Sequence, residues 1–407
     1  MAINHILYCG SFRFPDGDAA AARVLGIGKA LRMSGYDVEF AGWEEQESEV
    51  DSQSDGSYAY EGFSYKSQDE FRQQQLSPVK RLFRYLSAGA NTLRWLSKKE
   101  LKDVSVIIAY HGNSIFLLRL HSFCKKHGIR LIVDCTEWYA PNHLVGGSFG
   151  IVRLDNEIRM RWINTRIGWL IPISSYLEKY YASRGGCVLR MPPLVDMSEA
   201  KWLVTENFRE SGGPLRLVYA GTPAKKDLLG NVLRGLCSLK KEGICVELDL
   251  VGPSREAVVA CIENDTGILE TLGKALVFHG RVPQSEVPLL LARADFSVLL
   301  RPKERYAEAG FSTKLVESLA SGVPVITNPT SDIAEFIRDG EHGIMLTDCT
   351  PNAFVAGIRT ALSLSSEQKH NMRRSARRLA ETSFDFRRYA VPLEKFIKDS
   401  TVDMTRS

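Results

Sequence analysis

A glycine followed by hydroxyl and lysine side chains, GFSTK from Gly310 to Lys314, precedes a run of apolar residues at helical spacing. Gly310 predicts a turn that leaves the backbone N–H groups of Phe311, Ser312 and Thr313 at the start of a helix. Unpaired amides and the positive end of the helix dipole attract an anion, and Lys314 adds a full charge. The segment therefore predicts a phosphate or diphosphate site.

A carboxylate lies one turn further along the same predicted helix. Glu317 and Thr313 are four residues apart, hence on one face, and the helical rise places Glu317 roughly 6 Å beyond the anion. There it can accept hydrogen bonds from two adjacent hydroxyls, such as those of a ribose attached to a diphosphate. The alternative is that Glu317 is a solvated helix residue, and this stretch alone favours neither interpretation.

Polar residues also follow predicted strands in the first half of the chain. The loop GSFRFPDGDAAAAR lacks the GxGxxG pattern of a dinucleotide site, so an NAD site is not favoured, while Asp18 before four alanines predicts a helix N-cap. His111 and Asn113 end the third predicted strand, where cleft residues of an α/β sheet belong. A lone histidine at a strand end is nevertheless more often an ordinary hydrogen-bonded residue.

Two acids, Asp134 and Glu137, come at the end of the fourth predicted strand. Charge is costly at a strand end unless it meets a substrate or an arginine. An inward ion pair with Arg161 or Arg166 explains these acids at least as well as a role in binding.

Apolar runs alternate with helical patterns twice along the chain, which predicts parallel sheets covered by helices on both faces. In the first half we predict strands at 5–10, 37–43, 104–110, 129–135 and 168–174, and helices at 20–33, 116–126 and 175–183. In the second half the strands are 215–221, 246–252, 275–280, 296–302, 323–328 and 343–346, and the helices are 228–241, 255–264, 284–292 and 313–321.

The predicted fold is α/β, with two doubly wound Rossmann-like domains facing across a ligand cleft. The N-terminal domain is expected at residues 1–195, and a linker with the segments PPLVD and SGGP at 196–214. The second domain is expected at 215–385, followed by a C-terminal helix and tail at 386–407 that could return to the first domain.

Composition limits the classes of partner. A net charge of +4 over 407 residues does not indicate nucleic-acid binding. Eight scattered cysteines without a CxxC pair argue against zinc and against a disulfide framework, and favour a reducing cytoplasm. The N-terminus lacks signal-peptide features, and no segment approaches the roughly 20 apolar residues of a membrane span. We expect a cytoplasmic protein.

The segment ADFSVLLRP…AGFSTKLVESLASGVPVIT resembles the donor-binding signature of the family four retaining glycosyltransferases, which have the GT-B fold. LRLVYAGTPAKKDLLGNVL resembles the glycine turn and lysine phosphate loop of this family, and ALVFHGRVPQSEV its following strand. SDIAEFIRDGEHGIML is similar to part of the last third. The resemblance covers the whole chain, more loosely in the first domain, and bacterial polysaccharide and glycolipid glycosyltransferases are the members it suggests.

The resemblance implies a donor-binding set in the second domain. Glu317 would hold the ribose hydroxyls, the amides near Ser312 would hold the diphosphate, and Lys226 aligns best with the basic residue of the phosphate loop. The full set is Gly221, Thr222, Lys225, Lys226, Gly280, Arg301, Gly310, Phe311, Ser312, Thr313, Lys314 and Glu317.

Two positions depart from the family pattern. The first glutamate of the signature would fall at Ala309, which has no carboxylate, although Glu308 is next to it. The arginine that follows the glycine turn is replaced by Thr222, and Arg301 is the candidate substitute cation.

On the acceptor side, the resemblance places the loop after the first strand at the cleft, near the transferred sugar and the acceptor. It implies that Gly17, Asp18, Arg23, His111, Asn113 and Glu137 line this cleft. The candidate catalytic residues are Lys226, Arg301, Glu137 and His111.

The predicted function is retaining transfer of a sugar from a nucleotide-diphosphate donor, preferably a UDP-sugar, to a saccharide or lipid-linked saccharide. The helix N-terminus with Lys226, Lys314 and Arg301 would neutralise the leaving diphosphate without a metal ion or another cofactor. One alternative is a catalytically inactive GT-B scaffold or subunit that binds a nucleotide sugar, for which Ala309 argues. The other is a sugar-nucleotide epimerase of the same fold.

A basic amphipathic stretch runs from Val79 to Lys102. Leucine, phenylalanine and tryptophan recur there at helical spacing among seven lysines and arginines and one acid. Such a helix can lie on an anionic membrane surface, which would make the protein peripheral at the inner face of the cell membrane. The alternative is a domain helix whose apolar stripe faces the core.

Overall fold

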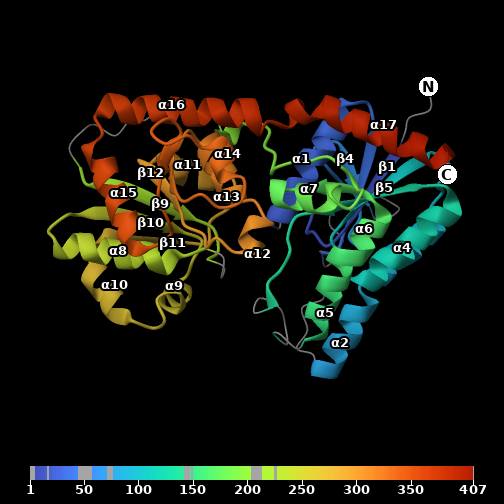
Figure 1. Ribbon diagram of the computed structural model, residues 1–407, viewed down its shortest axis with the longest axis horizontal. Coiled ribbons are helices and arrows are strands. Elements are labelled where there is room, and N and C mark those ends of the chain that lie inside the picture. The colour runs from blue at the N-terminus through green and yellow to red at the C-terminus, as the bar shows by residue number, and fades with distance from the viewer. Residues whose placement is uncertain are drawn as a thin grey trace. The chain divides into compact units, whose positions relative to one another are not determined.

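The structure is a computed structural model that describes residues 5–15, 18–44, 57–70, 77–141, 147, 150–202, 213–223 and 227–406. The chain forms two compact units (Figure 1). Unit 1 comprises Met1–Leu194 and Phe386–Ser407, and unit 2 comprises Val195–Asp385. Three predicted site residues, Gly17, Lys225 and Lys226, and residues 203–212 of the predicted linker lie outside the described residues.

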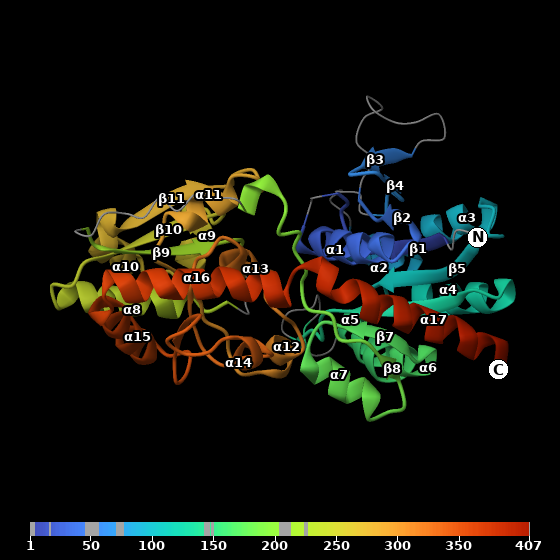
Figure 2. The same ribbon diagram turned by 90° about the horizontal axis from the view of Figure 1, so that it is seen from above.

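Unit 1 contains a sheet with the strand order β3-β4-β2-β1-β5-β6-β7-β8, in which neighbours are parallel except for the antiparallel pair β3–β4 (Figure 2). The strands are β1 (His5–Gly10), β2 (Asp37–Gly42), β3 (Tyr58–Tyr60), β4 (Phe63–Tyr65), β5 (Val104–Tyr110), β6 (Arg130–Cys135), β7 (Trp169–Pro172) and β8 (Cys187–Val188). The order reverses between β1 and β5, and the ends of these two strands form the switch point of the sheet.

Helices cover both faces of this sheet. They are α1 (Ala19–Met33), α2 (Pro78–Ser87), α3 (Ala90–Lys98), α4 (Ser114–His127), α5 (Ile151–Ile158), the π-helical turn η3 (Arg159–Ile163), α6 (Asn164–Ile167), α7 (Ser175–Ala182), the 3₁₀ turn η6 (Phe386–Tyr389) and α17 (Ala390–Arg406). α17 packs on β6 together with α4 and α6, and it also packs against α1. The ring of Phe396 on α17 lies 5.2 Å from the ring of Trp169 on β7, so the C-terminal segment completes the core of unit 1.

The amphipathic stretch from Val79 to Lys102 is two helices rather than one. The break occurs at Gly89, which has φ +86° and lies so close to Phe116 that a Cβ would be 2.1 Å from the ring. Only glycine fits both the left-handed backbone and this contact. α3 buries Thr92 and Leu96, so its apolar side belongs to the core of unit 1.

Unit 2 contains a fully parallel sheet with the order β11-β10-β9-β12-β13-β14. Its strands are β9 (Leu215–Ala220), β10 (Val246–Val251), β11 (Leu276–Gly280), β12 (Phe296–Leu299), β13 (Val325–Thr327) and β14 (Gly343–Met345). Its helices are η4 (Ala200–Trp202), α8 (Leu229–Lys241), α9 (Arg255–Cys261), α10 (Thr266–Leu272), η5 (Gly273–Ala275), α11 (Val287–Ala292), α12 (Arg305–Glu308), α13 (Thr313–Ala320), α14 (Ile333–Phe336), α15 (Pro351–Ser363) and α16 (Ser366–Ser383).

Alternate residues of β9 explain the two helical layers of unit 2. Leu217 and Tyr219 belong to the core shared with α8 and α15, whereas Val218 belongs to a second core with α11 (Figure 1). The strand order reverses between β9 and β12, so the loops after these two strands are where a ligand site is expected.

The predicted α/β fold with two parallel-sheet Rossmann-like domains is confirmed. Every predicted strand is present, and the predicted helices differ mainly at their ends. The sequence pattern missed the short antiparallel pair β3–β4 because three-residue strands are too short to show a period.

Candidate functional site

Three glycines end the adjacent strands β9, β10 and β11 of unit 2. Gly221, Gly252 and Gly280 have φ values of +121°, +106° and +63°. The amide of Gly252 donates to the carbonyl of Gly280 at 2.7 Å, and a Cβ on Gly252 would lie 3.2 Å from the backbone of Gly221. The backbone is therefore close-packed at this edge of the sheet. Gly252 was not predicted as a site residue, although it follows a predicted strand as Gly221 and Gly280 do.

Gly221 supports Lys314 directly. A Cβ on Gly221 would lie 2.4 Å from Cε of Lys314, so the lysine crosses the strand end where a side chain is absent. Lys314 is in the first turn of α13, and its ammonium donates to the hydroxyl of Tyr219 and to the carbonyl of Thr222, each at 3.3 Å. The predicted residues Gly221, Thr222 and Lys314 are thus brought together.

Asp227 neutralises this lysine and was missed by the sequence analysis. Lys314 forms a hydrogen-bonded ion pair with the buried Asp227 carboxylate, which also accepts from the Tyr219 hydroxyl at 3.0 Å. Burial alone would raise the pKa of Asp227, but Lys314 and Arg301 hold it below its ordinary value. The available signal was an acid directly after Lys225 and Lys226, in a loop between a strand and a helix.

Arg301 is the second cation beside Asp227. Its backbone is fixed by Asn328, directly after β13, because its amide donates to Asn328 Oδ1 at 2.9 Å and its carbonyl accepts from Asn328 Nδ2 at 2.8 Å. The side chain is 2% exposed, and Nε lies 3.6 Å from Asp227 Oδ1. Among the residues that the structure describes, neither Nε nor Nη1 has a hydrogen-bond partner. A buried guanidinium with unused donors is costly unless an anion occupies the space beside it.

The start of α13 supplies further donors. The structure records no hydrogen bond for the amides of residues 311–313 with the described part of the chain. Ser312 is the N-cap of α13 and is buried, and the Phe311 ring packs edge-on against Phe336 at 5.7 Å. The predicted helix start and its free amides therefore have a rigid support. Gly310 precedes them, and its carbonyl accepts from the Ser331 hydroxyl at 2.5 Å.

Glu317 lies one turn along α13, partly exposed at its surface. Burial raises the pKa of its carboxyl, although Lys314 and Lys201 lower it. No hydrogen bond joins this carboxylate to another described residue. It is therefore available to a ligand, and its contact with a ribose stays a prediction.

The position where the family signature has its first glutamate is closed. Ala309 is completely buried, so a ligand does not reach its side chain. Next to it, Glu308 ends α12 and is half-buried, and its Oε1 is buried without a hydrogen-bond partner in the described part of the chain.

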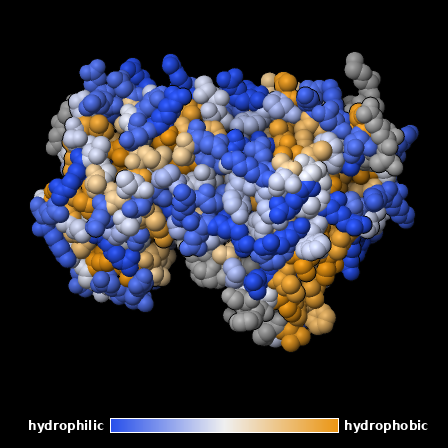
Figure 3. Space-filling view, in the orientation of Figure 1, coloured by the Kyte–Doolittle hydropathy of each residue, from blue (hydrophilic) through white to orange (hydrophobic). Residues whose placement is uncertain are grey.

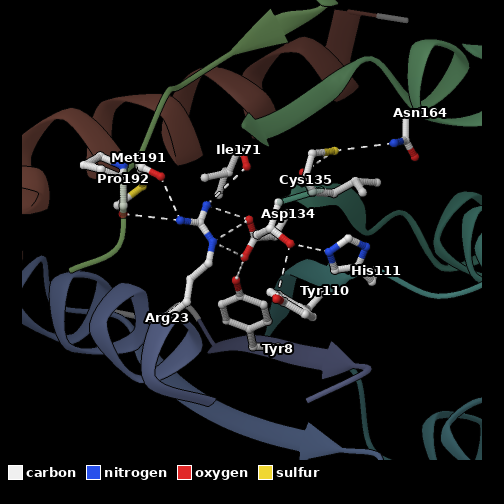
Figure 4. Close-up of polar contacts among 12 residues, drawn as sticks. Tyr8, Arg23, Tyr110, His111, Asp134, Cys135, Asn164, Ile171, Met191 and Pro192 are labelled. Atoms are coloured by element: carbon white, nitrogen blue, oxygen red, sulfur yellow. Dashed lines mark hydrogen bonds and ion pairs between the residues drawn. The ribbon is translucent and has the colours of Figure 1, made fainter. Parts of the chain in front are cut away.

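In unit 1, Arg23 lies in a different environment from the predicted one. It is 2% exposed, and its guanidinium pairs with Asp134 at 2.7 Å and donates to the carbonyl of Met191, also at 2.7 Å (Figure 4). The Tyr8 hydroxyl donates to the same carboxylate at 2.5 Å. Asp134 thus has an arginine partner, but it is Arg23 on α1 rather than Arg161 or Arg166. This network fixes α1 to the sheet.

His111 is held on both ring nitrogens. Arg159 Nη1 lies 2.7 Å from Nδ1, and because an arginine only donates, the ring proton must be on Nε2, which contacts the Thr136 hydroxyl. Arg159 lies in the π-helical turn η3 and is itself buried. In this tautomer Nδ1 accepts from Arg159, and the predicted role of His111 at the cleft stays a prediction.

The remaining predicted residues of unit 1 lie at the ends of their elements. Asp18 caps α1 by accepting from Ala21 N at 2.8 Å, as predicted. Asn113 caps α4 by accepting from Phe116 N at 2.7 Å. Burial and the neighbouring Glu137 carboxylate raise the pKa of Tyr139 well above its ordinary value, which places Glu137 beside the Tyr139 hydroxyl.

Metal ligands do not gather in the described residues. No group of three or more His, Cys, Asp or Glu side chains that could hold a metal ion occurs there. The expectation that the protein needs no metal ion stays a prediction.

Comparisons with known proteins agree with this architecture. Residues 212–379 match the protein family described as Glycosyl transferases group 1. The chain is 29% identical over 321 residues, 77% of its length, to 69% of the amylovoran biosynthesis glycosyltransferase AmsK of Erwinia amylovora.

Solved structures share the fold across almost the whole chain. A sucrose-phosphate synthase from Thermosynechococcus elongatus superposes with a TM-score of 0.73 at 14% identity, over 98% of this chain and all of that one. Anabaena HepE in complex with UDP and glucose gives a TM-score of 0.65 at 14% identity, over 98% and 99% of the two chains. The chain therefore has the GT-B fold, and residues 212–379, which lie in its second unit, are similar to the family Glycosyl transferases group 1.

Proposed function

We propose that the protein is a retaining glycosyltransferase that moves a sugar from a nucleotide-diphosphate donor, preferably a UDP-sugar, to a saccharide or lipid-linked saccharide acceptor. The observation that carries the proposal is the buried guanidinium of Arg301, close to the start of α13. Its Nε and Nη1 have no hydrogen-bond partner among the described residues. The name of the relative AmsK supports bacterial surface polysaccharide or glycolipid biosynthesis as the setting.

The charges at the site suit a diphosphate. Arg301 and Lys314 carry two positive charges against the single carboxylate of Asp227, and the amides of residues 311–313 add the positive end of α13. As the bond between the sugar and the β-phosphate breaks, charge accumulates on the leaving diphosphate. Preorganised donors at that position stabilise the transition state without reorganisation. The acceptor hydroxyl then attacks from the face that the diphosphate leaves, and its proton passes to the departing diphosphate oxygen.

Glu317 is the residue that would bind the nucleoside part of the donor. Its carboxylate is on the same helix as Lys314, one turn beyond the amides, and lacks a hydrogen bond to the described residues. It accepts from the 2′- and 3′-hydroxyls of the ribose. The complex of HepE with UDP supports uracil as the base to test first.

Isothermal titration calorimetry with UDP, ADP and GDP tests donor binding. Arg301→Met keeps the volume of a buried side chain but removes its donors, so it should weaken UDP binding roughly tenfold or more. Lys241→Met, at the exposed C-terminal end of α8, is the matched control and should bind as the wild type does. Wild-type affinity in Arg301→Met would remove the basis of the proposal.

A double-mutant cycle tests the ribose contact. Glu317→Ala should weaken binding of UDP but should leave binding of 2′,3′-dideoxy-UDP unchanged, because the hydroxyls that the carboxylate accepts from are then absent. Equal losses for both ligands would mean that Glu317 acts only through the stability of α13.

A second candidate function is binding without transfer. Ala309, buried and without a carboxylate at the position of the signature glutamate, favours this inactive scaffold. An assay of donor consumption distinguishes a glycosyltransferase from an inactive scaffold. It uses the donor that calorimetry identifies and is run with and without added saccharide acceptors. Glu308→Gln should reduce turnover and leave UDP affinity unchanged if the buried Oε1 of Glu308 serves the transferred sugar. Binding without any turnover, in the wild type as in the variant, would favour the scaffold.

A further inference from the structure

One face of α5 and η3 exposes large apolar side chains in a regular row. Ile151, Leu154, Ile158 and Trp162 follow at intervals of three, four and four residues, which places them on one side of the helix. Leu154 is 61% and Trp162 is 73% exposed. The opposite side of the helix, which packs toward the interior of unit 1, contains the buried Asn156, Arg159, Met160 and Ile163.

Two neighbouring helices extend this row. α4 packs against α2, α5 and η3, and it exposes Leu118, while α2 exposes Val79 and Phe83. We name the seven side chains together the apolar face: Val79, Phe83, Leu118, Ile151, Leu154, Ile158 and Trp162. Figure 3 shows hydrophobic surface over α2 and α5 at the lower end of unit 1. Contiguous apolar surface of this kind marks a binding site rather than ordinary solvent exposure.

Cations border the apolar face. A surface pocket of about 530 Å³ beside Trp162 is lined by Leu118, His121, Ser122, Lys125, Trp162, Ile163 and Arg166. Burial, Lys125 and Arg166 lower the pKa of His121, as expected where positive charge accumulates. Arg119 and Lys126 are also exposed on α4.

The acids nearby do not cancel this charge. Asp155 on α5 is turned inward, where it accepts from the amide of Ser114 at 3.0 Å and from the Tyr85 hydroxyl at 2.5 Å. Glu157 pairs with Arg161 at 2.6 Å, which uses one acid and one cation of η3 and α5. The lysine and arginine of the pocket therefore keep a positive border around the apolar side chains.

We propose that the apolar face rests on a lipid bilayer that contains anionic headgroups. Ile, Leu and Phe enter the boundary between headgroups and acyl chains, Trp162 lies at the interface, and Lys125 and Arg166 contact lipid phosphates. The basic border selects an anionic membrane over a second copy of this chain, whose own border would repel it. No helix in the described part of the chain has the length and hydropathy needed to cross a membrane.

This surface differs from the one predicted from the stretch between Val79 and Lys102. Only α2 of that stretch contributes, because α3 buries Leu96 in the core. α4, α5 and η3 supply the rest, and their contribution is visible only when the helices are placed side by side. The inference does not depend on the proposed transferase function, since its test measures lipid binding alone.

Co-sedimentation of the full-length chain with vesicles tests it. The protein should bind weakly to vesicles of phosphatidylcholine alone and strongly to vesicles that also contain phosphatidylglycerol. Its binding to the anionic vesicles should decrease as the salt concentration increases. Leu154→Ser with Trp162→Ser should lower the partition coefficient on anionic vesicles roughly tenfold or more. Lys125→Glu with Arg166→Glu should abolish the preference for anionic lipid.

Matched variants separate surface effects from folding. Leu289→Ser with Val391→Ser removes exposed apolar side chains elsewhere, and Lys241→Glu with Lys395→Glu reverses exposed charges elsewhere. Both controls should bind vesicles as the wild type does, with unchanged melting temperatures. The proposal would be overturned if the variant with Leu154→Ser and Trp162→Ser bound anionic vesicles as the wild type does. It would also be overturned if the wild type did not bind vesicles. A dimer in sedimentation velocity that Trp162→Ser dissociates would assign the apolar face to a second copy instead.

Discussion

Asp227 stands between two cations of unit 2, and this position predicts an unusual response to ligand. Asp227→Asn leaves Lys314 and Arg301 without their carboxylate, which should cost about 3–5 kcal/mol of stability. An added diphosphate supplies the missing negative charge, so UDP should raise the melting temperature of the variant more than that of the wild type. Differential scanning fluorimetry with and without UDP measures both effects. Asp399→Asn, an exposed control, should change neither.

Glu44, after β2, gives unit 1 a pH dependence. Burial raises the pKa of its carboxyl to about 8, although its own backbone amide and that of Phe14, at 3.3 Å, lower it in part. The folded protein keeps this proton to about pH 8, whereas the unfolded chain releases it near the ordinary value of 4.5. Folding therefore takes up a proton between these values, and stability decreases as the pH rises through that window.

Glu44→Gln removes this titration. The variant should be more stable than the wild type at pH 8, and the difference should shrink toward pH 5. Urea titrations at several pH values measure it, with the exposed Glu100→Gln as the control. A pH-independent difference would show that Glu44 is not titrating in this range.

At the residue scale, the sequence was sufficient where a signal is local. Asp18 and the amide that donates to its carboxylate, that of Ala21, are three residues apart, and the amides of 311–313 follow directly from the helix start at Thr313. It was insufficient where the partner is distant, because Asp227 meets Lys314 across 87 positions and Arg23 meets Asp134 across 111. Such pairs depend on strand order, which a single sequence does not give.

At the element scale, the strands were predictable from the sequence, whereas the contacts at the strand ends were not. β9 and β12 were predictable from their apolar runs, but the path of Lys314 across Gly221 depends on how α13 is tilted against β9. The same holds for α2 and α3. Their apolar spacing predicted one amphipathic helix, and the contact of Gly89 with Phe116 on α4 divides it.

Gly221→Ala tests the role of the β9 end. A methyl group would lie 2.4 Å from Cε of Lys314 and would also require φ +121°, so the lysine must move. UDP affinity should fall several-fold, together with a loss of about 1–3 kcal/mol in stability. Gly340→Ala is the matched control, with φ +73° and open space around the new Cβ. Gly340→Ala should lose a little stability and no UDP affinity. If it lost as much UDP affinity as Gly221→Ala, the contact between Gly221 and Lys314 would not be the cause.

At the scale of the whole molecule, the two units should melt as separable parts. Phe396 on α17 packs against Trp169 within the core of unit 1, and Phe396→Ala should cost that unit about 3–5 kcal/mol. Differential scanning calorimetry with UDP identifies the transition of unit 2 as the one that the ligand shifts. The substitution should lower the other transition. A loss of the UDP shift in this variant would show that the units do not melt independently.

The return of the C-terminal segment to unit 1 has a consequence for biosynthesis. A ribosome releases Val195–Asp385 before Phe386 and the helix that follows it. Unit 2 is continuous in the chain, so all of its strands are available while α17 is still being made. Unit 1 starts first, but its core lacks Leu393, Phe396 and Ile397 until that part of α17 emerges. In the growing chain the second unit can therefore finish folding before the first.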